Sequence, residues 1–355
     1  MFQNLTVVEL ASVLAGPAVG MFFSELGARV IKIENKTTKG DVTRRWKLPT
    51  EPATTPLSAY YCSVNYKKES LLLDLRSTSD YETVLQLIAA ADIVISNFKN
   101  SSAQKLKLDA ATLRQRFPKL IYAQLNGYPN GNDKPAFDVV LQAEAGFMYM
   151  NGSPDGLPVK MPVALIDILA AHQLKEGILV ALLQRERTGE GSTVTTSLYE
   201  SALASLANQA TNWLMANHIP QRMGSQHPNI APYGDIFKTK DHKDVVLAIG
   251  TEQQFKNLCK ALEYNDLVTD ERYKTNTVRV QHRKELAQLL QTKIAHWERD
   301  DLLEKLTTAK VPAGSIKNMQ EVFSDETAQQ MILKEKMSDG STSNRVKTVA
   351  FQLRK

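Results

Sequence analysis

Several patterns that mark common protein classes are missing from this chain of 355 residues. Its two cysteines, Cys62 and Cys259, lie far apart and form no CxxC pair, so no disulfide framework is expected. Its six histidines show no metal-ligand spacing, and there is no GxxxxGK[ST] loop and no GxSxG turn. No apolar run reaches about 18 residues, and the N-terminus does not resemble a signal peptide. We therefore expect a cytoplasmic protein with no metal site and no membrane span.

The charge balance argues against a nucleic-acid partner. Lysine and arginine number 43 and aspartate and glutamate 38, which gives a net charge of +5, and no long basic run is present. This mild excess suits a small anionic ligand. The hydrophobic fraction of 43% and the charged fraction of 23% are those of a globular protein, and the length allows two domains.

Apolar and helical patterns alternate through the first part of the chain, which predicts an α/β fold. The apolar runs are those of a parallel, doubly wound sheet in a Rossmann-like large domain. Strands are expected at 5–10, 29–34, 70–75, 92–97 and 120–125. Helices are expected at 18–28, 80–91 and 103–117. Pro17 is expected at the first position of the first helix, and residues 126–135 are expected to form a turn.

The first strand–helix–strand unit resembles a dinucleotide site only in part. Glu34 ends the second strand about 20 residues after Gly16, where such sites place an acid. The glycine pattern is GPAVG rather than GxGxxG, so nicotinamide binding is disfavoured. The basic loop that follows, residues 35–47, fits either a solvated loop or a phosphate clamp.

Two carboxylates stand beside apolar segments in the middle of the chain. Asp167 opens a long helical pattern that Gly189 ends, and Asp138 precedes another. Each fits a helix cap. Each also fits a pocket in which one carboxylate tunes the other, with Asp167 as a nucleophile stabilised at the helix N-terminus.

The composition changes after residue 218. We expect a large Rossmann-like domain over residues 1–218 and a linker with a small α+β domain over 219–309. The segment 310–355 is expected to return to the large domain. Residues 237–250 have the pattern of a β-hairpin with its turn at 240–243.

Taken together, the chain resembles the class III CoA-transferases, which include formyl-CoA and carnitine CoA-transferases and share their fold with α-methylacyl-CoA racemases. The similar segments occur in the family's order. They are VLAGP at 13–17, LGARVIKIE at 26–34, GDVTR at 40–44, LLLDL at 71–75, ADIVISNF at 91–98, KPAFDVVLQAEAG at 134–146, ALIDILAAHQLKEGILVALLQRERTGEG at 164–191, GSQHPNIAPY at 224–233 and VPAG at 311–314.

This resemblance implies an interlocked homodimer that binds an acyl-CoA and a small carboxylic acid. Coenzyme A would be a substrate rather than a tightly bound cofactor. The family's catalytic aspartate falls on Asp167, and Asp138 falls beside it. Lys105 falls where the family often has an arginine for a CoA phosphate. Asn35 falls on a second such arginine, which Lys36 or Lys39 is expected to replace. The other implied CoA contacts are Val13, Leu14, Ala15, Leu73, Arg76, Asn97 and Phe98.

The implied activity is transfer of CoA from an acyl-CoA to a carboxylic acid through an aspartyl mixed anhydride and an aspartyl-CoA thioester. Three alternatives remain at this point: an acyl-CoA racemase of the same fold, a CoA-binding module without catalysis, and a nicotinamide-dependent reductase, which the glycine pattern disfavours. The racemases carry a histidine where this chain has Phe137, which cannot transfer protons, so racemisation is disfavoured. The glycine-rich active-site loop of formyl-CoA transferase has no counterpart here.

Overall fold

The computed structural model describes residues 1–129, 132, 134–337 and 340–354, so part of the turn predicted at 126–135 lies outside the described residues. The chain forms two compact units. Unit 1 contains Met1–Met148, Lys160–Ile219 and Gln330–Lys355, and unit 2 contains Tyr149–Val159 and Pro220–Gln329. The sequence analysis placed domain boundaries at residues 218 and 309. That these are the limits of separately folding domains remains a prediction.

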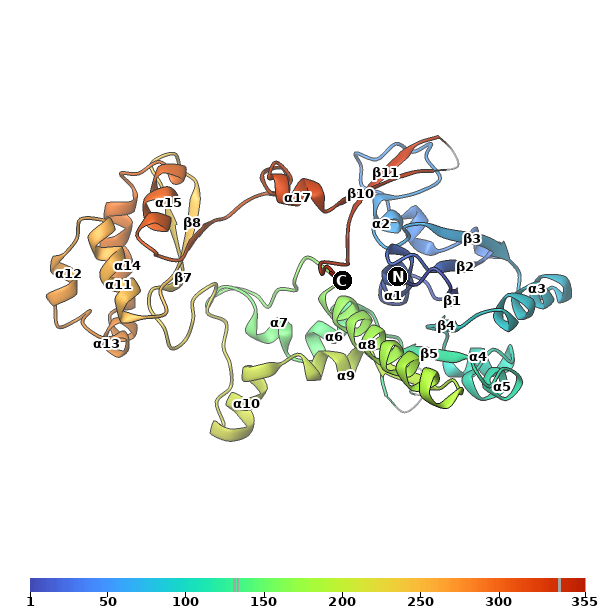
Figure 1. Cartoon of the computed structure of the whole chain (residues 1–355). Helices are drawn as coiled ribbons and strands as arrows, with labels where there is room; N and C mark the ends of the chain where they lie inside the picture. Colours follow the sequence, from blue (N-terminus) through green and yellow to red (C-terminus); the bar gives the residue numbers. More distant parts are fainter. Residues whose placement is uncertain (130–131, 133, 338–339, 355) are drawn as a thin grey trace. The chain divides into compact units, whose positions relative to one another are not determined.

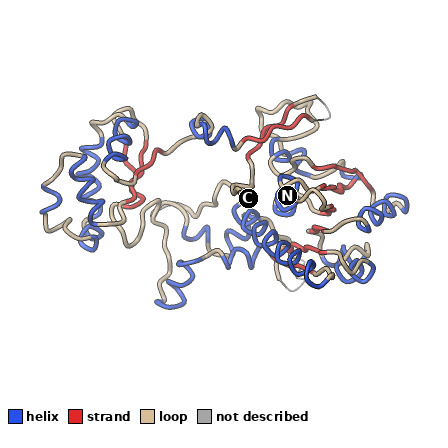
Figure 2. The backbone as a smooth tube through the Cα atoms, viewed as in Figure 1, coloured by secondary structure: helices blue, strands red, loops and turns tan. Residues whose placement is uncertain are grey.

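Unit 1 is built around a parallel six-stranded sheet in the order β3-β2-β1-β4-β5-β6, whose strands are red in Figure 2. The predicted α/β class with a parallel, doubly wound sheet is therefore confirmed. The strands are β1 (Thr6–Leu10), β2 (Arg29–Asn35), β3 (Lys68–Leu73), β4 (Ile93–Ser96), β5 (Ile121–Asn126) and β6 (Thr193–Ser197).

Helices cover both faces of this sheet. Helices α1 (Ala15–Glu25) and α8 (Leu165–Thr188) share one apolar core, and α3 (Thr78–Ala89) and α5 (Ala110–Arg116) share the other (Figure 1). Alternate strand residues serve the two cores. In β4, Ile93 and Ile95 join the core of α1 and α8, whereas Val94 joins the other. Burial on both faces explains why the central strands are largely apolar.

The remaining helical segments of unit 1 are short. Residues 103–117, predicted as one helix, instead contribute to two, because Lys107 adopts a left-handed conformation with φ of 52° and Asp109 caps the second helix. The short segments are η1 (Lys36–Thr38), η2 (Val42–Arg45), α2 (Ala59–Cys62), α4 (Asn100–Lys105), α6 (Asp138–Glu144), α9 (Leu198–Ala204) and α10 (Ala207–Ala216). Helix α7 (Phe147–Met150) runs from unit 1 into unit 2.

The first helix begins two residues earlier than its proline indicated. Helix α1 starts at Ala15, and its first helical bond joins the Ala18 N–H to the Leu14 carbonyl. Pro17 therefore occupies the third helical position rather than the first. That position is tolerated because N–H groups in the first turn have no intrahelical acceptor.

Unit 2 contains a small antiparallel sheet in the order β7-β8-β9. Strands β7 (Tyr233–Lys238) and β8 (Asp244–Ala248) form the predicted hairpin, and β9 (Ala313–Ser315) pairs with β8. The helices are α11 (Glu252–Ala261), α12 (Asp266–Thr269), α13 (Asn276–Gln281), α14 (Arg283–Ile294), α15 (Arg299–Thr308) and α16 (Met319–Val322).

The chain returns to unit 1 through α17 (Glu326–Gln330). There β10 (Ile332–Lys336) and β11 (Thr342–Val346) form an antiparallel hairpin that the sequence analysis did not predict. Beyond the hairpin, the N–H of Thr348 donates to the Glu25 carboxylate at 2.9 Å, which ties the C-terminal segment to α1. None of the helices among the described residues is both long and apolar enough to span a membrane.

Candidate functional site

The strand order reverses between β1 and β4, and the site lies at the carboxyl ends of these two strands. In doubly wound sheets such a switch point leaves a crevice where ligands bind. Here the Asn97 side chain, just after β4, bridges the crevice to the loop after β1. It donates to the Ser12 carbonyl at 2.9 Å and accepts from the Ser12 N–H at 3.2 Å. Two cavities of unit 1 flank this bridge, and Ser12 lines both.

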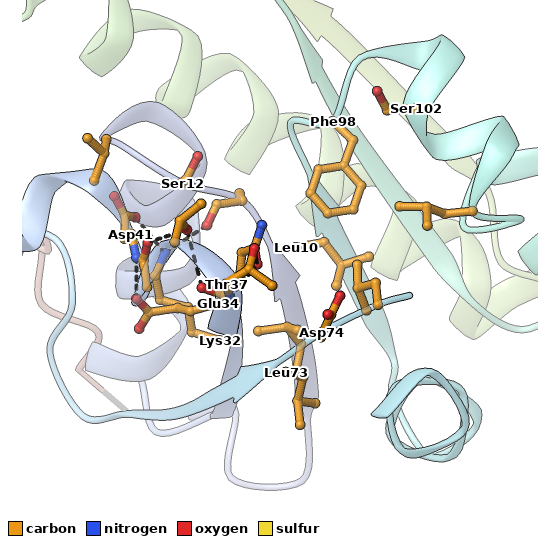
Figure 3. A pocket seen from close by; sticks show the side chains of 18 of the residues that line it. Leu10, Ser12, Lys32, Glu34, Thr37, Asp41, Leu73, Asp74, Phe98 and Ser102 are labelled. Carbon is orange, nitrogen blue, oxygen red and sulfur yellow. Dashed lines mark hydrogen bonds and ion pairs between the residues drawn. The ribbon is translucent and has the colours of Figure 1, made fainter. Parts of the chain in front are cut away.

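The larger cavity, of about 840 Å³, lies toward β2 and β3 (Figure 3). Of the residues expected to contact CoA, those that line it are Leu73, Arg76, Phe98 and Lys105. Arg45, from the basic loop, also lines it, whereas Lys36 is not among the described residues of its wall. Arg45, Arg76 and Lys105 together make the cavity suitable for phosphate groups.

The acid at the end of β2 is fully engaged by protein groups. The Glu34 carboxylate accepts from Arg44 at 2.5 and 2.8 Å, from the Tyr61 hydroxyl at 2.9 Å and from the Asp41 N–H at 2.6 Å. It also accepts from Ser70. Burial opposes its ionisation, but these donors outweigh burial and lower the pKa of Glu34 to about 2. Glu34 therefore has no free lone pairs for a ribose, and Arg44 is not available for a phosphate.

The smaller cavity, of about 180 Å³, lies toward β5 and β6. It brings together five residues predicted from the sequence, namely Val13, Leu14, Ala15, Asn97 and Asp167. Phe137 also lines it. Two cationic side chains in its wall, Lys99 and Lys134, were not predicted as site residues.

Asp167 is the buried carboxylate of this cavity. It lies in the first turn of α8 and is 8% exposed. Burial, and secondly the nearby charge of Asp138, raise the pKa of Asp167 from 3.8 to about 7. Asp167 is the third residue of α8 rather than its N-cap, and no capping bond from its own side chain is found among the described residues, so the capping role considered for Asp167 is not observed. Gly189, with φ of 77°, ends the helix as predicted.

Asp138 contacts the start of α8 rather than the cavity. One carboxylate oxygen accepts from the Ile166 N–H at 2.7 Å, and the other accepts from the Gln142 amide at 2.6 Å. The side-chain oxygen of Gln142 in turn accepts from the Met161 N–H at 2.8 Å. Asp138 thus bonds the backbone next to Asp167 and also acts on it through its charge.

Further side chains around the site are Asp41, Tyr60 and Trp46. Asp41, 4% exposed, lines the larger cavity and bonds the turn beside the smaller one. The pKa of Tyr60 is raised to about 12, first by burial and secondly by the nearby charge of Asp167. Trp46 packs edge-on against Tyr60 at 5.0 Å between ring centroids. No group of three or more metal-ligating side chains is found in the described part of the chain.

The chain is similar in sequence and in fold to several known proteins. A sequence model described as CoA-transferase family III matches residues 2–355. Succinate–glutarate CoA-transferase from Agrobacterium fabrum is 38% identical, over 92% of this chain and 82% of that protein. Acetyl-CoA:oxalate CoA-transferase from Acetobacter aceti is 32% identical, over 94% and 85%. The crystal structure of a CAIB/BAIF family protein from Brucella suis has a TM-score of 0.87 at 36% identity, over 99% of this chain and 92% of that one.

Proposed function

Since this chain belongs to CoA-transferase family III and is a CoA-transferase, we propose that Asp167 performs the transfer as a nucleophile. The observation that carries the proposal is the buried carboxylate of Asp167 in the wall of the smaller cavity. A carboxylate is a poor nucleophile in water because hydration stabilises it. Asp167 is largely stripped of that hydration, as its raised pKa indicates, and it would be held beside the bound thioester.

In the proposed complex, acyl-CoA extends through both cavities and passes Ser12, which lines both. The phosphates and adenine of CoA occupy the larger cavity, where Arg45, Arg76 and Lys105 face the phosphates. The thioester end reaches the smaller cavity, past Ser12 and Asn97. This arrangement is supported by the position of both cavities at the switch point of the sheet.

The reaction exchanges one thioester for another without a change in oxidation state. The ionised Asp167 attacks the thioester carbonyl, the carbon–sulfur bond breaks, and CoA leaves as a thiolate. The product is a mixed anhydride of Asp167 and the acyl group. The thiolate then attacks the Asp167 carbonyl and releases the first acid as a carboxylate, which leaves an aspartyl-CoA thioester. The acceptor carboxylate repeats both steps in reverse, so the carboxylate of Asp167 is restored.

We further propose that the acceptor is a dicarboxylic acid. The relatives named above act, by their names, on succinate, glutarate or oxalate, each of which carries two carboxylates. Here Lys99 and Lys134 line the same small cavity as Asp167. One acceptor carboxylate would react at Asp167 while the second binds a lysine. Lys134 now pairs with Glu144 at 2.5 Å, and that pair is partly exposed, so a second carboxylate can compete for it at modest cost.

The homodimer implied by the sequence resemblance also remains a proposal. Its support in this chain is the apolar surface of α10, where Trp213, Leu214 and Met215 are 49%, 77% and 82% exposed. Clustered exposed apolar side chains of this kind usually mark an interface. Sedimentation equilibrium of the purified protein tests this: a mass of one chain at all concentrations would contradict it.

The nucleophile is tested by mass spectrometry of CoA esters. The wild type, Asp167→Asn and Glu176→Gln are incubated with succinyl-CoA and a panel of acids. Glu176→Gln is the control because it removes an exposed carboxylate from the same helix. New esters from the wild type and the control, but not from Asp167→Asn, are expected. Near-normal transfer by Asp167→Asn would contradict the mechanism, and deuterium exchange at the α-carbon without transfer would point to an isomerase.

The acceptor class is tested with succinate and butyrate, which differ by one carboxylate. Lys99→Met and Lys134→Met are expected to raise the KM for succinate by about tenfold, the effect of losing one charged hydrogen bond, and to leave butyrate transfer unchanged. Lys119→Met removes an exposed lysine outside both cavities and is the matched control. Equal effects on both acids would contradict the dicarboxylate proposal.

A further inference from the structure

The turn between β1 and α1 contains a strained residue. Val13 adopts a left-handed backbone conformation with φ of 72°. For a β-branched side chain this conformation is a rare outlier, and such strain persists only where surrounding contacts impose it. Val13 lines the smaller cavity together with Asp167, so the strain lies at the proposed reaction site.

Side chains from other parts of unit 1 bind the backbone of each residue of this turn. The Lys32 ammonium donates to the Ala11 carbonyl at 2.7 Å, and Asn97 binds both backbone groups of Ser12. The Val13 N–H donates to the Asp41 carboxylate at 3.1 Å from one oxygen and 3.4 Å from the other. Residues 35–47 were expected to form either a solvated loop or a phosphate clamp. One residue of this loop, Asp41, anchors the turn.

The surroundings of Asp41 require a carboxylate. One of its oxygens accepts from the Thr43 N–H at 3.0 Å and the Thr43 hydroxyl at 2.8 Å. The other accepts from Val13 and lies 3.2 Å from the Lys32 ammonium, whose side chain is fully buried. Both oxygens face donors, so an asparagine would place its NH₂ group against an N–H in either orientation. Figure 3 shows Asp41, Lys32 and Ser12 at this edge of the larger cavity.

We infer that Asp41 is a positioning residue for CoA transfer, because it holds Val13 in the left-handed conformation and so fixes the turn that lines the smaller cavity. This inference rests on the proposed function of Asp167. The turn leads directly into α1, and within the described part of the chain the N–H groups of Leu14 and Ala15 find no acceptor. Both residues line the cavity of Asp167, so their donors are available to an acyl oxygen that gains charge during the reaction.

The test is a double-mutant cycle between Asp41→Asn and Val13→Gly. Without its anchor, Val13 is expected to leave the left-handed region, and kcat should fall about ten- to a hundredfold, the factor that this backbone strain represents. The dissociation constant for CoA should change much less. Glycine adopts positive φ without strain. In the Val13→Gly background, Asp41→Asn should therefore reduce kcat only a few-fold.

Equal losses of kcat in the two backgrounds would overturn the inference, because an effect of Asp41 through the fold or through Lys32 would not depend on residue 13. If Asp41→Asn does not fold, Thr43→Val is used instead, since it removes the 2.8 Å bond that orients the carboxylate. It should show a smaller loss with the same dependence on Val13→Gly, and a loss independent of Val13→Gly would again overturn the inference.

A failure of this inference can be distinguished from a failure of the proposed function. If the wild type transfers no CoA, the proposed function fails, and hydrogen–deuterium exchange of the peptide spanning residues 11–17 then decides the inference alone. Faster exchange in Asp41→Asn, or in Thr43→Val where that variant replaces it, would support the anchoring of the turn, and unchanged exchange would overturn it.

Discussion

Replacement of Asp167 by asparagine is expected to stabilise the folded protein above neutral pH while it abolishes CoA transfer. Burial first, and Asp138 second, raise the pKa of Asp167 from 3.8 to about 7. Between these two values the folded protein holds a proton that the unfolded chain has released. The free energy of unfolding therefore falls as the pH rises through this window, and above it the folded protein contains an ionised, poorly hydrated carboxylate.

The size of the effect follows from the two pKa values. One pKa unit corresponds to about 1.4 kcal/mol, so Asp167 destabilises the fold by about 4 kcal/mol at about pH 8 and by about 1.5 kcal/mol at about pH 5. Asparagine has nearly the same shape and never ionises. Its advantage in the free energy of unfolding over the wild type should thus be larger by about 2.5 kcal/mol at the higher pH.

Equilibrium urea unfolding of the wild type and Asp167→Asn at both pH values measures this difference. Glu176→Gln, which removes an exposed carboxylate from α8, shows the effect of lost charge alone. If Asp167→Asn differs from the wild type by the same free energy at both pH values, the carboxyl is not held with a raised pKa. The argument that its burial makes it reactive would then be refuted.

Three other predictions concern the same region. In the wild type, kcat/KM should rise about tenfold between about pH 6 and about pH 8 as Asp167 ionises. Asp138→Asn should move this rise to lower pH, because it removes a charge that raises the pKa of Asp167. A pH–rate profile that is flat, or that the substitution does not move, would contradict the assignment. Glu34→Gln should lower the free energy of unfolding at neutral pH by about 3 kcal/mol. Ionised Glu34 stabilises the fold above its unfolded pKa of 4.5, and this stabilisation is lost as the pH falls through about 2. Urea unfolding that is the same in the variant and the wild type would contradict this prediction. Gly20→Ala should lower the thermal midpoint, since a Cβ there would overlap the buried Glu9 carboxylate, and a midpoint equal to that of the wild type would show that the carboxylate can move aside.

The periodic parts of the fold could be predicted from the sequence, and the irregular parts could not. Apolar runs such as 92–97 and 120–125 predicted strands because both faces of the sheet are buried. The break within 103–117 escaped because it depends on one left-handed lysine, Lys107, which leaves no pattern in the composition. The β10–β11 hairpin escaped because its strands are largely polar and exposed, so they lack the alternation of a half-buried sheet.

The site was predictable where a residue stands out against its local background. Asp167 interrupts an apolar segment, and the family resemblance then singled it out. Asp41 is the lone acid of the basic loop at 35–47, and only the three-dimensional structure shows that it faces Lys32 and Val13. Likewise, nothing in the sequence indicated that Lys99 and Lys134 share a cavity with Asp167, because this contact depends on how the loops after β4 and β5 fold.

The size of the smaller cavity has a kinetic consequence. Small-molecule sites commonly measure about 300 Å³ or more, whereas this one measures about 180 Å³. This volume suits one short acid at a time. Under the proposed mechanism the outgoing acid must then depart before the incoming acid can bind, while CoA stays attached to Asp167. Initial rates measured at several donor concentrations should give parallel double-reciprocal lines. The two CoA esters should compete for the free enzyme, and the two acids should compete for the enzyme that carries CoA on Asp167.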